Sequence, residues 1–257
     1  MNQRATAATV RRWRALSTRA DRMAQGLFLV EGEHMVLEAV RMGRAQTLLA
    51  QEDRIERFPD LLSSGVPVLY LTQTQFAQVA DSKTPQGIAA LCALPAMPDI
   101  AALGSRIVAL NGVQDPGNVG TILRTMDAAG FTGMLTDVQT ADAFSPKALS
   151  ASMGSIHRVP VHVTDDLPSA LDSLVGFDII AGDLRGTPFY ARQPVGPAVC
   201  LLIGSEGAGL PPEVLARATM RLKLPMVGGA ESLNAAVAAS IMMYDLLRER
   251  LQPPNMP

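Results

Sequence analysis

The sequence has few cysteines and no long apolar run, and both absences narrow the class of protein. The two cysteines, Cys92 and Cys200, lie far apart and lack the spacing of metal ligands. We therefore expect buried, reduced thiols, no metal site and a protein of the cytoplasm. No apolar run is long enough to span a membrane, and the first residues do not spell a charged and then apolar secretory signal. No membrane partner is expected.

The chain also lacks a clear excess of charge, because its formal net charge is −2. Its first two dozen residues are nevertheless rich in arginine and hold one acid, Asp21. Beside Trp13, these arginines could neutralise RNA phosphates and stack a base. A solvated helix face and an organellar transit peptide are the alternatives. The candidate RNA contacts in this segment are Arg11, Arg12, Arg14 and Arg22.

The apolar pattern divides the 257 residues into two α/β blocks, and 48% hydrophobic residues are ample for two cores. In the first block, one helix over 33–42 is surrounded by short apolar runs. This alternation predicts a small α/β domain with a mainly parallel sheet. The expected strands of this block cover 26–32, 46–51, 66–72 and 87–94.

The stretch from Leu94 to Ser105 is the best candidate for a linker, because it has two prolines, few charges and no clear period. We place the boundary near Pro98, which gives domains over 1–98 and 99–257. Beyond it, strands and helices alternate again up to a long final helix that is expected to start at Ser232. The second block is thus a larger α/β domain with a parallel sheet.

The first of three informative loops is DPGNVGTILR, from Asp115 to Arg124. Its first half has turn-forming residues, and Asn118 stands where an N-cap is expected. Gly130 is expected to end the helix, and Arg124 falls on the side opposite the apolar stripe. A capped helix with an ordinary surface arginine is the alternative, and this segment alone favours it. The predicted buried stripe comprises Val119, Ile122, Leu123 and Met126.

The second loop, GSEGAGLPPEV, follows a continuous apolar run. In an open parallel sheet, ligands bind beyond the carboxyl ends of strands, and glycines let the backbone approach them. The loop is neither a dinucleotide fingerprint nor a phosphate-binding P-loop, since it lacks the G-x-G start and the Lys-Ser/Thr pair. Glu206 in this loop could position a hydroxyl or balance a cation, and a bare turn with a solvated carboxylate is the alternative.

The third loop runs from Leu224 into the final helix. Ser232 is expected to cap this helix, and Asn234 lies in its first turn, so that both could form a polar clamp; plain capping is the alternative. The stripe expected to be buried along this helix comprises Leu233, Val237, Ile241 and Tyr244.

Together the three loops resemble the SpoU (TrmH) family of RNA 2′-O-ribose methyltransferases. The motifs that carry the resemblance are DPGNVGTILRT, LIGSEGAGL and LPM-x5-SLN-x2-VA, in this order and near these distances. The resemblance covers roughly residues 8 to 250, since FLVEGEHMVLEAV and TPQGIAAL are similar to the RNA-binding domain that precedes the catalytic domain in many members. It argues against a transit peptide.

The resemblance implies a fold, a cofactor and an assembly. The second domain would be a SPOUT domain with a deep trefoil knot and a mainly parallel sheet, preceded by a small L30e-like α/β domain. S-adenosylmethionine would lie in the knot, and two copies would form a homodimer through helices that include the last one. By motif match, the cofactor contacts would be Leu202, Ile203, Gly204, Gly207, Leu224, Met226, Ser232 and Leu233.

The resemblance also implies a catalytic set, formed by Asn118, Arg124, Glu206, Ser232 and Asn234. Methyl transfer to a weakly acidic ribose hydroxyl needs alignment and stabilisation of developing negative charge. Arg124 suits that stabilisation and also a grip on the adjacent phosphate, whereas a guanidinium holds its proton too firmly to serve as the base. The proton acceptor stays unassigned.

The expected substrate is structured RNA, and large-subunit rRNA is favoured over tRNA because relatives with this domain arrangement commonly modify it. A tRNA 2′-O-methyltransferase and a non-catalytic RNA-binding relative are the alternatives within the family. A nucleotide-cofactor oxidoreductase is the alternative outside it, and the missing G-x-G-x-x-G argues against that reading.

Overall fold

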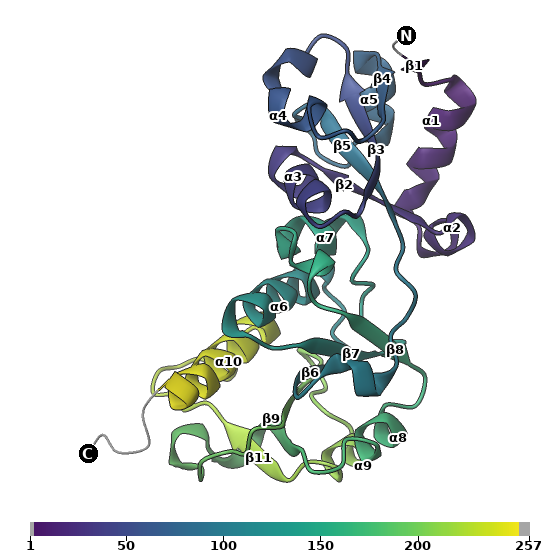
Figure 1. Ribbon diagram of the computed structural model, residues 1–257. Coiled ribbons are helices and arrows are strands. Elements are labelled where there is room, and N and C mark those ends of the chain that lie inside the picture. Colours follow the sequence, from purple (N-terminus) through teal and green to yellow (C-terminus); the bar gives the residue numbers. More distant parts are fainter. Residues whose placement is uncertain (1–2, 252–257) are drawn as a thin grey trace. The chain divides into compact units, whose positions relative to one another are not determined.

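A computed structural model describes residues 3–251, which fold into two compact units (Figure 1). The first unit comprises residues 3–96 and 144–157, and the second comprises 97–143 and 158–251. The ends of the two expected domains, 1–2 and 252–257, lie outside the described residues. No helix of the described part is long and apolar enough to cross a membrane.

The first unit is built on a five-stranded sheet in the order β1-β4-β3-β5-β2. β5 runs antiparallel to both β2 and β3, whereas the other two pairs are parallel. The expectation of a mainly parallel sheet is therefore wrong for this unit. Residues 80–87 connect helix α5 (Gln73–Val79) to β5, and this connection permits a strand that runs opposite to β4. The strands are β1 (Gln3–Arg4), β2 (Leu27–Glu31), β3 (Ala45–Gln51), β4 (Val68–Leu71) and β5 (Ile88–Ala93).

The helices of the first unit begin at side-chain caps that the sequence supplies. Thr6 caps α1, Thr18 caps α2, and Thr72 forms a capping box with Gln75 at the start of α5. One apolar side of α1 packs on the sheet, where Val10 and Trp13 join the core. The helices are α1 (Ala7–Arg14), α2 (Arg19–Gln25), α3 (Glu33–Arg41), α4 (Pro59–Leu62), α5 (Gln73–Val79) and α7 (Pro146–Ser152), with 3-10 turns at Ala15–Ser17, Ile55–Arg57 and Ser155–His157.

The second unit contains a six-stranded sheet in the order β11-β9-β10-β6-β7-β8, and every pair in it is parallel. This confirms the α/β class and the mainly parallel sheet expected for it. The strands are β6 (Arg106–Asn111), β7 (Gly133–Asp137), β8 (Val161–Thr164), β9 (Asp178–Pro188), β10 (Val199–Gly204) and β11 (Met220–Lys223).

Helices cover both faces of this sheet (Figure 1). On one face lie α6 (Pro116–Ala129) and α10 (Ala235–Leu251), and on the other lie α8 (Leu167–Asp172) and α9 (Pro212–Leu215). Short 3-10 helices occur at Ile100–Leu103 and Phe189–Ala191. The first of these lies in the stretch expected to be a linker, and its Leu103 is fully buried in the core of the second unit.

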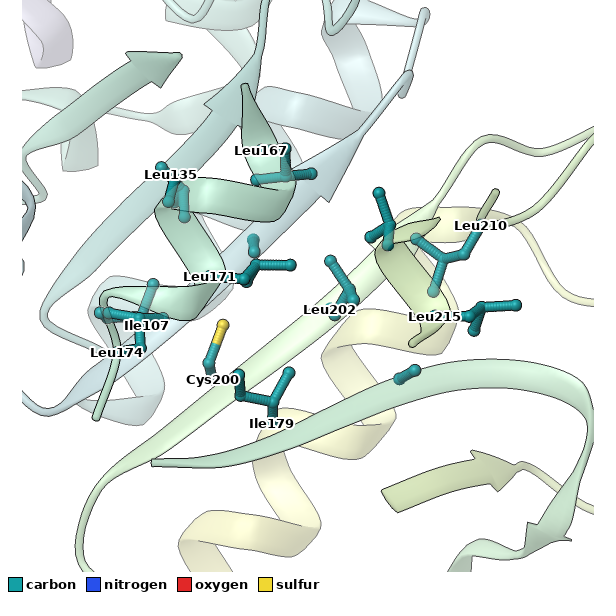
Figure 2. Packing of buried hydrophobic residues seen from close by; sticks show 14 of the residues in the cluster. Ile107, Leu135, Leu167, Leu171, Leu174, Ile179, Cys200, Leu202, Leu210 and Leu215 are labelled. Carbon is teal, nitrogen blue, oxygen red and sulfur yellow. The ribbon is translucent and has the colours of Figure 1, made fainter. Parts of the chain in front are cut away.

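Strand alternation sends neighbouring side chains of β10 to opposite faces of the sheet. Cys200 and Leu202 belong to the cluster beneath α8 and α9, where they lie among leucines of those helices (Figure 2). Both cysteines of the chain are buried and free, as expected, and burial raises the pKa of each thiol to about 12.

The long last helix differs from the expectation in its start and in its buried side. α10 begins at Ala235 and is capped by Asn234, so Ser232 is not its cap. Its buried residues are mainly alanines and methionines, because a small-residue face lets α10 pack against α6. Val237 and Tyr244, expected to be buried, are 46% and 51% exposed.

Candidate active site

The three loops singled out in the sequence meet at the carboxyl edge of the second sheet. β6 and β10 are adjacent and in register, so Gly204 at the end of β10 lies opposite Asn111 at the end of β6. The chain continues outward from β6 toward β7 and β8, whereas β9 and β11 lie beyond β10. The strand order therefore reverses between β6 and β10, where a crevice for ligands is expected in an open parallel sheet.

The loop after β10 folds back tightly over the end of its own strand. Ser205 pairs with Gly209, whose backbone N–H donates to the Ser205 carbonyl at 3.0 Å. A Cβ atom at Gly204 would overlap the Gly209 backbone and lie 2.7 Å from the backbone nitrogen of Leu210. Glycine at 204 is thus required for the fold of this loop, which carries Glu206 exposed at its tip.

The helix after β6 is capped by a different residue from the one expected. Asp115 is the N-cap of α6, and its carboxylate accepts from the Gly117 N–H at 2.8 Å, while Pro116 takes the first helical position. Asn118 therefore lies within the first turn, where its side chain is released from capping. Gly130 ends the helix in the left-handed conformation, and the predicted apolar stripe is fully buried.

Asn118, Glu206 and Asn234 form one directed chain of hydrogen bonds, which we call the amide relay. The Asn234 Oδ1 atom accepts the N–H groups of Ala236 and Val237, at 2.9 and 3.2 Å. Its Nδ2 consequently donates to Asn118 Oδ1 at 2.9 Å, and Asn118 Nδ2 donates to Glu206 Oε1 at 2.5 Å.

The orientation of every amide in the relay follows from the cap of α10. Because Asn234 must present its oxygen to the helix, its nitrogen faces Asn118, which in turn must present its own nitrogen to Glu206. A charged carboxylate is the natural end of such a chain, since it only accepts. Glu206 Oε2 has no hydrogen-bond partner within residues 3–251 and remains available to a hydroxyl donor.

A cavity of about 570 Å³ opens beside the relay, at the ends of β9, β10 and β11. This size lies in the usual range for small-ligand sites, and the mixture of glycine backbone, apolar side chains and a few charges is typical of them. Most of the predicted cofactor contacts line it: Ile203, Gly204, Gly207, Leu224, Met226, Ser232 and Leu233. Leu202 does not line it, because its side chain points into the core beneath α8 and α9.

The predicted catalytic residues fall into three groups by their place in the structure. Glu206 and Ser232 line the cavity, whereas Asn118 and Asn234 stand behind Glu206 and reach it through hydrogen bonds. Arg124 is exposed on α6, and no hydrogen bond or ion pair links its side chain to any other described residue. The structure therefore brings together Asn118, Glu206 and Asn234, and it leaves Arg124 facing solvent.

Asp183 is a residue of the cavity wall that the sequence analysis missed. Its side chain is 10% exposed and pairs with Arg221, and the Arg185 N–H donates to it at 3.1 Å. Burial by itself raises the pKa of Asp183, but the Arg185 N–H and the Arg221 guanidinium outweigh that effect, so its pKa lies below the usual value. The signal in the sequence was the acid that ends the apolar run FDIIAGD.

The arginines of the first unit that were expected to contact RNA differ in their exposure to solvent. Arg11, Arg12 and Arg14 are exposed on α1, whose first turn has no acid. Arg22 instead is 3% exposed and donates to the carbonyls of Leu16 and Ser17 at 2.7 and 2.9 Å. Its guanidinium stabilises the end of a 3-10 turn, so the structure gives it a structural role in place of RNA contact.

Comparison with known proteins finds matches across both units. The sequence model of the SpoU rRNA methylase family matches residues 105–244, and that of an MRM3-like substrate-binding domain matches residues 7–90. The 23S rRNA (guanosine(2553)-2′-O)-methyltransferase RlmP of Bacillus subtilis is 37% identical over 240 residues, which is 92% of this chain and 95% of that protein.

Two solved structures with bound S-adenosylmethionine are similar to the whole chain. An rRNA methyltransferase from Sinorhizobium meliloti is 30% identical, with a TM-score of 0.82 and 98% of both chains covered. The SpoU methyltransferase AviRb from Streptomyces viridochromogenes is 27% identical, with a TM-score of 0.85 and coverage of 96% of this chain and 99% of that one.

Proposed function

This chain belongs to the SpoU rRNA methylase family, and we propose that it methylates a ribose 2′-hydroxyl of large-subunit rRNA. It is an RNA 2′-O-methyltransferase that uses S-adenosylmethionine. The observation that carries the proposed site is the amide relay, in which side chains from three distant loops converge on one carboxylate at the cavity.

The cavity has the chemistry that S-adenosylmethionine requires. Leu224 and Met226 offer apolar contact for the adenine, and the loop after Gly204 brings backbone groups to its edge. Asp183 and Glu206 supply negative charge for a cofactor that carries an ammonium and a sulfonium. When bound, the cofactor supplies an electrophilic methyl group.

The residues around the cavity would then position the ribose. Glu206 is held by Asn118 through Oε1, which leaves Oε2 to accept the hydrogen of the incoming 2′-hydroxyl. Arg124 would grip the adjacent phosphate and stabilise the developing negative charge on the oxygen. Ser232 lies at the cavity wall, where its hydroxyl would contact the cofactor or the nucleotide.

We assign the second unit to the trefoil-knotted SPOUT fold and the first to the L30e-like fold. The likeness to SpoU methyltransferase structures over nearly the whole chain supports both assignments. The proposed domains, 1–98 for RNA and 99–257 for methyl transfer, follow the two family matches. We place the protein in the cytoplasm, where bacterial ribosomes are modified.

A homodimer through α10 explains the apolar side of that helix. Val237 and Tyr244 are about half exposed and Leu251 is 73% exposed, all on one long helix of the described chain. Contiguous apolar surface of this kind marks protein interfaces. Tyr244→Glu should convert the dimer into a monomer in light scattering, and Arg217→Glu, two residues after the end of α9, should not. A dimer that persists unchanged in Tyr244→Glu would contradict this interface.

The role of Arg124 is tested by Arg124→Ala, with Arg217→Ala as a control that removes the same charge from the opposite face of the sheet. Arg124→Ala should abolish methyl transfer and leave the affinity for S-adenosylmethionine unchanged in calorimetry, because Arg124 does not line the cavity. Normal turnover in this variant would overturn the assignment.

The RNA target is tested by mapping 2′-O-methyl ribose across total RNA from cells with and without the gene. We expect one rRNA mark to disappear from the large subunit. Loss of a tRNA mark with all rRNA marks intact would identify a tRNA enzyme. Absence of heat on titration with S-adenosylmethionine would instead indicate a non-catalytic RNA-binding relative.

A further inference from the structure

The first unit contains a second cavity that the reaction does not use. It has a volume of about 540 Å³, and all its lining residues belong to that unit. One wall is Trp13 and Arg14 at the end of α1, another is the end of α5 with the loop after it, 78–86, and a third is formed by Phe144 and the start of α7. Its size falls in the range of sites that hold a small molecule or a single nucleotide.

We propose that this cavity receives one unstacked nucleobase of the RNA substrate, an inference that rests on the proposed function. Sequence-specific RNA recognition usually takes splayed-out bases, which contact aromatic side chains and form hydrogen bonds along their edges. Trp13 and Phe144 supply aromatic surface, and Ser17, Thr84 and Ser150 supply hydroxyl groups.

The loop that forms one wall is held in place, so the cavity is preformed. Glu31 accepts the N–H groups of Asp81 and Ser82, at 2.8 and 3.2 Å, and the Ser82 hydroxyl at 2.6 Å. Gln86 Oε1 accepts the Glu33 N–H at 2.8 Å, which leaves the Gln86 Nε2 hydrogens as donors. An amide fixed in this way can distinguish the edge of one base from that of another.

The charges of the cavity favour a neutral ring with a phosphate at its rim. Among the described lining residues, Arg14 is the one with a positively charged side chain, and Glu31 and Asp81 are the acidic ones. Two carboxylates disfavour a free anion inside. Arg14 is exposed and forms no side-chain hydrogen bond or ion pair within residues 3–251, so its guanidinium is available to the phosphate of a nucleotide whose base is inserted.

The sequence provides its own reporter, because Trp13 is the one tryptophan of the chain and lines this cavity. We would titrate the full chain with adenosine, guanosine, cytidine and uridine 5′-monophosphates and follow tryptophan fluorescence. At least one of them should quench it saturably, and inorganic phosphate should not. No saturable quench, or an equal effect of inorganic phosphate, would overturn the proposal.

Two pairs of matched variants locate the binding site. Gln78→Phe fills the cavity from α5 and should abolish the quench, whereas Gln73→Phe places the same ring on the same helix outside the cavity. Arg14→Gln should weaken nucleotide binding about threefold, and Arg19→Gln, which removes the same charge from an exposed position on α2 outside the cavity, should not. Quenching that survives Gln78→Phe would assign the nucleotide to another site.

The failure of this proposal can be told apart from failure of the proposed function. Gln78→Phe and Gln73→Phe should both bind S-adenosylmethionine normally. Gln78→Phe should raise the KM for RNA with little change in kcat. Methyl transfer with an unchanged KM in Gln78→Phe would refute the nucleobase pocket and leave the proposed enzymatic function standing. Nucleotide quenching without any methylation of RNA would support the pocket and refute the proposed function.

Discussion

Asn234 has two tasks, and the substitution Asn234→Asp separates them. A carboxylate at 234 can still accept the N–H groups of Ala236 and Val237, so the cap of α10 is retained. It cannot donate to Asn118 Oδ1, as the Asn234 amide does. Asn118 would then turn its own nitrogen toward the new carboxylate and present its oxygen to Glu206.

The expected loss of rate follows from the bond that this rotation breaks. The Asn118 Nδ2 donor to Glu206 Oε1 is a hydrogen bond to a charged group, worth about 1.5–3 kcal/mol. If that orientation is needed in the transition state, kcat falls roughly 10- to 150-fold, since about 1.4 kcal/mol corresponds to a factor of ten. The affinity for S-adenosylmethionine should change little, because neither asparagine lines the cavity.

The control is Asn234→Ala, which removes both the cap and the donor. It should lower the free energy of unfolding by about 1 kcal/mol in urea titrations, whereas Asn234→Asp should leave it near that of the unmodified protein. Turnover is measured under single-turnover conditions, with a radioactive methyl group and RNA from cells that lack the gene. The relay is refuted if Asn234→Asp turns over at the normal rate while it remains folded.

Three further predictions concern the cavity, the stability and the thiols. Gly204→Ala should reduce the affinity for S-adenosylmethionine by more than about tenfold in calorimetry, because the added Cβ overlaps the loop; unchanged affinity would contradict the geometry. Arg192→Met should lower the free energy of unfolding by about 3 kcal/mol, since its side chain is 6% exposed and pairs with two acids of α10. Arg248→Met, at a side chain that is 58% exposed, should cost much less in the same urea titration. Cys92 and Cys200 should resist an aromatic disulfide reagent at pH 8 until the protein is unfolded, because burial keeps both as thiols with a pKa of about 12; rapid labelling of the folded protein would contradict this.

The sequence predicts the second unit well where apolar period and burial coincide. The stripe of α6 and the parallel strands follow from residues that a single chain must bury, as Val119 and Ile122 do. The same reasoning fails for α10, where Val237 and Tyr244 are apolar and exposed. Periodicity identifies an apolar side, but it does not tell whether that side faces the core of its own chain or another surface.

The choice of helix caps and the direction of one strand were two other features that the sequence did not predict. Asp115 and Asn118 are both good caps within one turn, and so are Ser232 and Asn234, and the choice between them depends on backbone geometry that residue types do not specify. The antiparallel direction of β5 is a property of strand pairing that the apolar runs of the sequence do not specify. The relay could be anticipated as a set of residues, but its order along the hydrogen bonds required coordinates.

The segment Phe144–His157 gives the chain an unusual route. It lies between β7 and β8 in sequence, yet it belongs to the first unit, where Phe144 and His157 both contact the ring of Phe28. The polypeptide therefore passes from one unit to the other at three places, 96/97, 143/144 and 157/158. A protease would have to cut at all three crossings to separate the two units, so one nick in the Leu94–Ser105 stretch breaks the covalent link of only the N-terminal segment and leaves Phe144–His157 of the first unit joined to the second.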